Sequence, residues 1–469
     1  MVVGVRCLAT TPNPFNTLEH QRLRTGALCE SLKQRFAELH ARDYPDDGAA
    51  KALWLLADLL TLLQKRVQLI ADEKTLIMAG EVVIELGETL EYFDNAGTDQ
   101  TPRGLVVLLQ SLYARLGWPS NLLAWPQSVY NFTIRPFVEN LAVLFQYLGP
   151  DAEIDAVLKA YTGPRDLVSF PRIERDNVRM YAIFGHEIGH RIAGEFLKQE
   201  QADATFSGEE AAIRAKVIAA MGGSPSIIDA QKLIEKVFSL RKRALEELIS
   251  DIVGVYLFGP SALYAGHEIH FDASMDRVPS LANNGYPPGR MRLRISLELC
   301  RAEGHLDALV EFVDDPKTGK AFAAGVSLVD HIDRLIGIRS DVQAITHDPF
   351  VSIAYDWVNV TLPSAQAFAR NAMGAALYPT SAQRNECSKL VERLLDGLPP
   401  NEIGSALAPV QVDARSAVLA AWLISLDGAQ SGPGDESYTL FRLNEKTLRG
   451  IEYIELQRCY LEKFPRTAP

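Results

Sequence analysis

The sequence predicts a mainly α-helical protein with a small β element. Two observations support this prediction: residues recur at helical spacing along most of the chain, and runs of strand-forming residues are rare. The 469-residue chain is 47% hydrophobic and 23% charged, so it has enough apolar side chains for a sizeable core. We expect three regions: a helical N-terminal region at 1–150, a central region at 151–300 and a helical C-terminal region at 301–469.

Four helices are expected in the N-terminal region, because each stretch carries charged or apolar residues at helical spacing. They cover 18–40, 52–70, 81–93 and 105–116. Turn-forming residues separate them, at Tyr44-Pro45-Asp46-Asp47-Gly48, Asn95-Ala96-Gly97 and Gly117-Trp118-Pro119.

The central region begins with the best strand candidate, Asp166–Pro171. Helices are then expected at 177–198, 209–220 and 226–257, followed by an irregular loop at 267–288 that is rich in Asp, Asn, Gly and Pro. The C-terminal region returns to a helical pattern. We expect breaks in it near Pro316, Pro363, Pro399-Pro400 and Gly432-Pro433-Gly434.

The charge and the cysteine content of the chain indicate which partners and which compartment to expect. A net charge of −12 disfavours nucleic acid or an anionic membrane as the main partner. Five scattered cysteines without a C-x-x-C pair favour a reducing compartment. The N-terminus does not read as a signal peptide, and the most apolar stretch, Ala52–Leu63, is too short to span a bilayer. We therefore expect a soluble cytoplasmic protein, of an oligomeric state that the sequence does not indicate.

The central region contains the motif H-E-x-x-H at His186–His190. On a helix, His186 and His190 are one turn apart on one face, so both imidazoles can reach one metal ion. Glu187 is rotated off that line, where it can hold a water molecule without ligating the ion. This is the arrangement of a hydrolytic zinc site with a general base. The alternative is a half-buried helix whose histidines only form hydrogen bonds.

A catalytic zinc takes three protein ligands, and the third is predicted on a separate helix. Phe196 stands where a metzincin would have its third histidine, so that class is rejected. Glu247 and Asp251 are four residues apart and therefore share a helix face. Glu247 can ligate the metal, while Asp251 accepts a hydrogen bond from a ligating histidine. The alternative is an acidic, solvent-facing edge beside Arg241-Lys242-Arg243.

These two motifs together resemble those of the gluzincins, the thermolysin-like zinc metallopeptidases that pair H-E-x-x-H with E-x-x-x-D. The run E-L-I-S-D-I-V-G at 247–254 is close to the corresponding helix of that family. The resemblance implies a zincin-like core and one zinc ion per chain, bound by His186, His190 and Glu247. It also implies Glu187 as general base and Asp251 as support for a ligand histidine. It covers these two helices only, and the stretch between His190 and Glu247 is much longer than in thermolysin-like enzymes.

The segment Asn284–Arg292 is the leading candidate to supply a side chain that stabilises the oxyanion of the tetrahedral intermediate. It resembles the H-P-P…R segment that follows the third ligand in membrane-bound gluzincins of the CAAX-processing type, with Tyr286 in place of the histidine. The Tyr286 hydroxyl can donate a hydrogen bond, and Arg290, Arg292 or Arg294 could orient the oxyanion or bind a substrate carboxylate. We take Tyr286 and Arg292 as catalytic candidates. The alternative is a Pro-rich turn before a basic helix.

Two further histidines, His267 and His270, echo the metal motif but with a spacing of three. We expect a surface or substrate-cleft role for them, with His270 as a second candidate for oxyanion donor. The resulting hypothesis is a zinc metallopeptidase that cleaves peptides or proteins, using Asp166–Pro171 as the strand edge that binds substrate. The alternatives are a regulatory or defence protein that cleaves one dedicated partner, and a non-catalytic helical interaction protein with a structural zinc.

Overall fold

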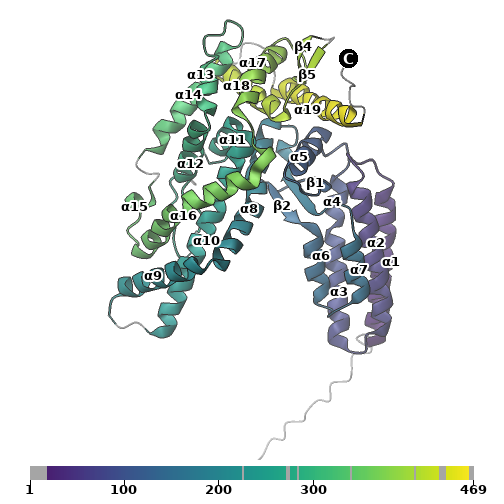
Figure 1. The fold of residues 1–469 in the computed structure, drawn as a ribbon. Coiled ribbons are helices and arrows are strands. Elements are labelled where there is room, and N and C mark those ends of the chain that lie inside the picture. The colour runs from purple at the N-terminus through teal and green to yellow at the C-terminus, as the bar shows by residue number, and fades with distance from the viewer. Residues whose placement is uncertain are drawn as a thin grey trace, which may run out of the picture. The chain divides into compact units, whose positions relative to one another are not determined.

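A computed structural model describes residues 18–223, 226–270, 275–282, 285–337, 341–405, 408–431 and 440–463. The predicted mainly α-helical class is confirmed, with few strands (Figure 1). Asn284 and the break at Gly432-Pro433-Gly434 lie outside the described residues.

The chain forms two compact units. Unit 1 comprises residues 1–101, 121–129 and 135–170, and unit 2 comprises 102–120, 130–134 and 171–469. We had expected three regions, with boundaries after residues 150 and 300. Unit 2 instead combines nearly all of the expected central and C-terminal regions, and it takes two short pieces from the N-terminal region.

Unit 1 is a bundle of helices around one apolar core. Its longest helices, α1 (Leu18–His40) and α2 (Gly48–Leu69), run side by side in Figure 1. The apolar face of α2 recurs every three to four residues, from Leu56 through Leu60 and Leu63 to Val67, and is buried in the core. The remaining helices are α3 (Glu73–Glu88), α4 (Leu90–Asn95), α6 (Phe137–Gln146) and α7 (Ala152–Ala160).

Strand β3 occupies Asp166–Pro171, as predicted, and is the central strand of a three-stranded sheet. The sheet order is β1 (Leu122–Gln127), β3, β2 (Thr133–Pro136). A central strand has hydrogen-bonded neighbours on both sides, so β3 has no open edge to offer a peptide. The expectation that Asp166–Pro171 supplies a substrate-binding edge is therefore wrong; among these strands, β1 and β2 are at the edges.

Unit 2 is built from long helices, of which α8 (Ile183–Ala202) and α10 (Ile227–Phe258) are central to the site described below. The side chain of Ser226 caps α10 by accepting a hydrogen bond from the backbone N–H of Asp229, at 3.1 Å. The other elements are α5 (Arg103–Arg115), η1 (Arg172–Glu174), η2 (Val178–Ala182), α9 (Ala204–Met221), α11 (Pro260–His270), α12 (Gly289–Ala302), α13 (His305–Val310), α14 (Gly319–Ile336), α15 (Val342–Ile345), α16 (Pro349–Met373), η4 (Gly374–Ala376), α17 (Thr380–Leu395), the antiparallel pair β4 (Glu402–Ser405) and β5 (Ala408–Gln411), α18 (Ala414–Ser431) and α19 (Leu440–Lys463).

Two local expectations in unit 2 are wrong. Pro363 does not break the chain but lies inside α16, whose residues before and after it are buried, among them Tyr355, Val358 and Ala369. This packing offsets the cost of the backbone hydrogen bond that proline cannot make. The expected loop at 267–288 begins later than predicted, because α11 continues to His270.

None of the described helices is long and apolar enough to cross a membrane.

Candidate metal centre

The site is built where α8 and α10 cross at close range. A Cβ added to Gly189 of α8 would lie 2.4 Å from the Cα of Ser250 on α10, and one on Gly185 would lie 3.0 Å from the Cα of Gly254. Only small residues permit this approach. The Ser250 hydroxyl donates to the Glu246 carbonyl at 2.6 Å, so its polar group is satisfied within α10. The crossing brings the H-E-x-x-H turn of α8 next to the E-x-x-x-D turn of α10.

Helix α8 presents His186, Glu187 and His190 as one group. Their metal-ligand atoms all lie within 4.8 Å of one another, and the two imidazole rings meet edge to face with centroids 4.7 Å apart. All three side chains are partly buried. Among the described residues, this is the group of three or more His, Cys, Asp or Glu side chains that is close enough to share an ion.

Helix α10 adds two carboxylates on the same side, that of the buried Glu247 and that of the partly buried Asp251. Oδ1 of Asp251 lies 2.8 Å from Nδ1 of His186, and Oε2 of Glu247 lies 3.6 Å from Nε2 of the same ring. The two nitrogens of His186 therefore face different carboxylates. Because Asp251 engages Nδ1, Nε2 is the nitrogen that remains for a metal. Glu247 therefore approaches the group of His186, Glu187 and His190 from the Nε2 side of His186.

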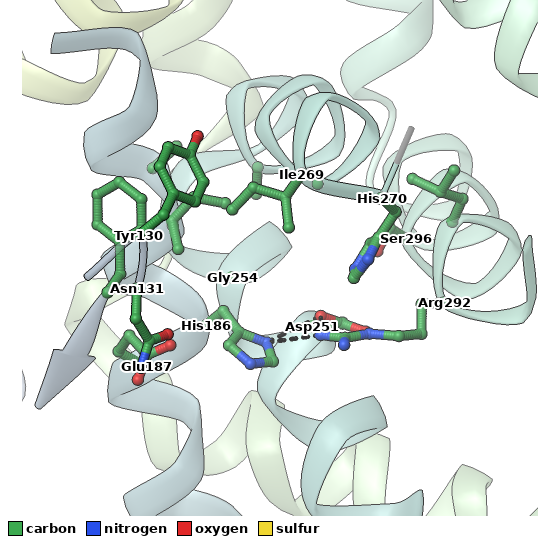
Figure 2. A pocket seen from close by; sticks show the side chains of 16 residues that line it. Tyr130, Asn131, His186, Glu187, Asp251, Gly254, Ile269, His270, Arg292 and Ser296 are labelled. Carbon is green, nitrogen blue, oxygen red and sulfur yellow. Dashed lines mark hydrogen bonds and ion pairs between the residues drawn. The ribbon is translucent and has the colours of Figure 1, made fainter. Parts of the chain in front are cut away.

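Arginine side chains form ion pairs with both carboxylates, those of Glu247 and Asp251. Arg292, on α12, donates to Asp251 through Nε and Nη2, each at 2.7 Å, and its Nη1 lies 3.1 Å from Glu247. Arg243, one turn before Glu247 on α10, approaches the other Glu247 oxygen at 3.1 Å. Figure 2 shows Asp251 between His186 and Arg292. These contacts compensate the burial of two carboxylates that would otherwise be costly.

The surroundings of Glu187 and His190 shift the pKa values of these two side chains in opposite directions. Burial, together with nearby Glu247, raises the pKa of Glu187 to about 7. Burial, together with the charges of His186, Arg243 and Arg292, lowers the pKa of His190 to about 3. His190 is therefore a neutral imidazole at neutral pH, which is the form that ligates metals.

Asp251 and His186 behave as a hydrogen-bonded pair. Burial works to raise the pKa of Asp251, but Arg292 and His186 outweigh it and hold that pKa well below its usual range. Burial works to lower the pKa of His186, and its contact with Asp251 more than offsets this, so the pKa is raised. Asp251 is therefore an anion that fixes the ring orientation of His186.

A pocket of about 200 Å³ opens beside these residues. His186, Glu187, Asp251 and Arg292 supply its charged and polar wall, and apolar residues including Ile183 and Ile269 supply much of the rest. In Figure 2, Tyr130 and Asn131 lie on the Glu187 side of the pocket, whereas His270 and Ser296 lie on the Arg292 side. The backbone of Ile134, within the edge strand β2, hydrogen-bonds to the Glu187 carboxylate.

The remaining sequence candidates lie in different places. His270 lines the pocket, whereas the ring of His267 meets that of His331 with centroids 5.7 Å apart. Tyr286 is 40% exposed and is not among the described residues that line the pocket. Its hydroxyl accepts a hydrogen bond from Arg243, and its ring lies under that guanidinium. Arg292 lines the pocket, but its guanidinium is bound to Asp251 and Glu247.

Sequence reasoning missed Arg243 as a partner of Glu247, and it missed the role of Gly185 and Gly189. A local signal existed for each. Arg243 precedes Glu247 by four residues, so the two share a helix face, and the two glycines have the same spacing on α8. Asn131 carries no comparable signal, because it precedes a short strand that was not predicted.

Comparisons with protein-family models, with curated proteins and with solved structures find no match to this chain.

Proposed function

We propose that this protein is a zinc-dependent metallopeptidase of gluzincin type, with a zincin-like catalytic core in unit 2. The observation that carries the proposal is the pairing of His186 Nδ1 with Asp251 while Nε2 faces Glu247 at 3.6 Å. Two ligand atoms on a tetrahedral zinc ion are about 3.4 Å apart. The donor set of two imidazoles and one carboxylate is that of a catalytic zinc site with one position left for water.

His186, His190 and Glu247 would hold the ion, one per chain, and Asp251 would orient His186. When bound, zinc supplies a Lewis acid that polarises a carbonyl group and acidifies a water molecule. A purely structural site has no need of Glu187, and the presence of a carboxylate in this group favours hydrolysis over a structural zinc.

Glu187 would act as general base. Its carboxylate accepts a proton from water as the water oxygen adds to the scissile carbonyl carbon. The C–N bond then breaks as the same proton passes from Glu187 to the leaving nitrogen. The hydrogen bond from the Ile134 backbone holds Glu187 at the edge of β2, so an extended peptide that pairs with this edge would pass beside the base.

The oxyanion of the tetrahedral intermediate would need a donor on the pocket side of the site. His270 lines the pocket and is one candidate. The Tyr286 hydroxyl, whose oxygen accepts a hydrogen bond from Arg243, is a second candidate, and it would have to approach the pocket from outside the described residues that line it.

The test compares wild type with Glu187→Gln at matched zinc content on a library of proteome-derived peptides. Wild type should cleave peptides, and the variant should keep zinc while losing roughly 10²–10⁴-fold of the rate. Glu195→Gln is the matched control, because Glu195 is exposed on the same helix and pairs only loosely with Arg191, at 3.8 Å. It should retain full activity.

Each outcome has a distinct meaning. Many cleaved peptides indicate a broad peptidase, and cleavage of one protein alone indicates a dedicated partner. Equal rates for wild type and Glu187→Gln would assign the activity to a contaminant. A zinc-loaded wild type that cleaves no peptide or protein would overturn the proposal and leave a structural zinc.

A further inference from the structure

Unit 1 carries a groove of about 630 Å³ between α3 and α6. One wall is formed by Met78, Val82 and Leu86 of α3, and the other by Leu141 and Leu144 of α6 with Tyr147, the residue that follows α6. The volume is within the range of sites that bind ligands or the side chains of a partner. All residues that line the groove belong to unit 1, so the groove is separate from the candidate metal centre.

The apolar side chains of the groove form two stripes at helical spacing. Met78, Val82 and Leu86 follow one another every four residues along α3, so they share a face. Val143 of α6 is 52% exposed and Tyr147, directly after α6, is 63% exposed, although both line the groove. Val82, Leu86 and Leu141 are buried, so the exposed apolar surface of the groove comes from residues at its border such as Val143 and Tyr147. A groove between two helical stripes fits the apolar face of a third helix.

Two carboxylates line the same groove, and two more lie near one of its lining residues. Glu81 and Glu85 line it, and Glu88 and Glu91 act with Glu85 on Tyr92, a further lining residue. Within the described part of the chain, none of the four forms an ion pair. In the same unit, Glu19, Glu30 and Glu38 on α1 are each paired with a basic residue three positions away.

These unpaired carboxylates weaken α3. Glu81, Glu85 and Glu88 are spaced by four and three residues, so they lie on one face and repel each other. Arg135, which also acts on Tyr92, offsets only part of this negative charge. The fold gains nothing from the repulsion, whereas a positively charged partner would relieve it.

We propose that this groove binds a basic amphipathic helix of a partner polypeptide. Apolar residues of that helix, at positions i, i+3 or i+4, and i+7, fill the space between Val82 and Leu144. Lysine or arginine residues on its flank pair with Glu81 and Glu85. The exposed Val143 and Tyr147 form the apolar border on the α6 side.

The test measures binding of a synthetic peptide to the full-length protein by fluorescence anisotropy. The probe is an amphipathic helix with leucine on one face and lysine on both flanks. Two matched peptides replace lysine with glutamate or scramble the order so that no apolar face remains. The lysine peptide should bind at least roughly tenfold more tightly than either, and added salt should weaken it.

Variants locate the site. Glu85→Lys and Val143→Glu should each weaken the lysine peptide roughly tenfold, because one reverses a border charge and the other places a charge in the apolar stripe. The controls are Asp58→Lys, the same change of charge on the exposed face of α2, and Ile84→Glu, at a 46% exposed position of α3 outside the groove. Both controls should bind as wild type within about twofold.

Three results would overturn the proposal. The first is equal binding of the scrambled or glutamate peptide. The second is equal weakening by Glu85→Lys and Asp58→Lys, which would indicate general attraction to an acidic protein. The third is a wild-type dimer that Val143→Glu converts to monomer, since the occupant would then be a second copy of the chain.

Discussion

Glu247 is 2% exposed and its two oxygens are approached by different arginines, Arg243 and Arg292. These two ion pairs compensate the burial of the carboxylate and hold it beside His186, at 3.6 Å from Nε2. Glu246, its neighbour, is rotated away from His186 and instead approaches Arg243 at 3.5 Å and Lys242 at 3.9 Å. The two adjacent glutamates therefore make a matched pair for testing the third ligand.

Glu247→Gln should weaken zinc binding far more than Glu246→Gln, by at least about 100-fold, because an amide is a poor zinc ligand. Zinc content after dialysis against a graded chelator, measured by mass spectrometry, gives the affinities. Wild type should hold about one zinc per chain, and the double variant His186→Ala/His190→Ala should hold almost none. Equal losses for the two glutamate variants would contradict Glu247 as a ligand.

Asp251→Asn should weaken zinc binding by roughly 10–100-fold, because the anion that orients His186 is replaced by a neutral amide. The direct contact at 2.8 Å is the reason for this expectation. Circular dichroism should show an unchanged helix content, which separates loss of zinc from loss of fold. An Asp251→Asn protein with wild-type zinc affinity would remove Asp251 from the site.

At the scale of helices, the crossing of α8 and α10 depends on Gly189. Gly189→Ala should destabilise the protein by about 2–3 kcal/mol and weaken zinc binding, because the new Cβ would meet the backbone of Ser250. Gly194→Ala is the control on the same helix, where a Cβ would meet nothing within 4 Å. It should stabilise by up to about 1 kcal/mol through helix propensity. Urea denaturation measures both; equal effects would argue against a close crossing.

Elsewhere in unit 2, ion pairs of Asp413 connect helices α5 and α18. This residue pairs with Arg115 of α5 and with Arg415 of α18, each at 2.7 Å. Arg415 is 1% exposed and also donates to the carbonyls of Leu257 and Ala376. Burial works to raise the pKa of Asp413, but the two arginines outweigh it and hold that pKa below its usual range.

Because the folded-state pKa of Asp413 is lowered, its contribution to stability is present above the ordinary value of 3.8 and is lost as pH falls toward the lower, folded-state pKa. Asp413→Asn should therefore lower the free energy of unfolding by about 3 kcal/mol at neutral pH. The difference from wild type should shrink as the pH falls below 3.8. Denaturant titrations across this range test the sign; a difference that grows on acidification would contradict it.

At the scale of the whole molecule, the candidate metal centre and the α3–α6 groove belong to different units with separate sets of residues. A bound ligand stabilises the part of a protein that it contacts, together with any other part that unfolds cooperatively with it. At a zinc concentration 1,000-fold above Kd, the stabilisation is about 4 kcal/mol.

Zinc should therefore increase hydrogen-exchange protection in α8 and α10 of unit 2 and leave α1 and α2 of unit 1 unchanged. Exchange followed by mass spectrometry, with and without a chelator, makes this comparison. The His186→Ala/His190→Ala variant should show no change in either unit. Equal zinc-dependent protection in both units would show that they unfold as one.

Local spacing explains what could be predicted from the sequence. The helical period identified α1 with its observed limits and placed His186 and His190 on one face, because residues four apart on a helix are always neighbours. The same rule placed Glu247 beside Asp251. It did not identify β1 or β2, because such short strands depend on pairing with β3.

How these local patterns meet depends on contacts between residues far apart in the chain. The tertiary structure brought Asp251 to His186, engaged Arg292 with two carboxylates, and carried α16 through Pro363. Such contacts depend on which faces pack, on the space beside Gly189 and on the burial of charge. Spacing along one helix defines a face, but the packing of whole helices determines which other face it meets.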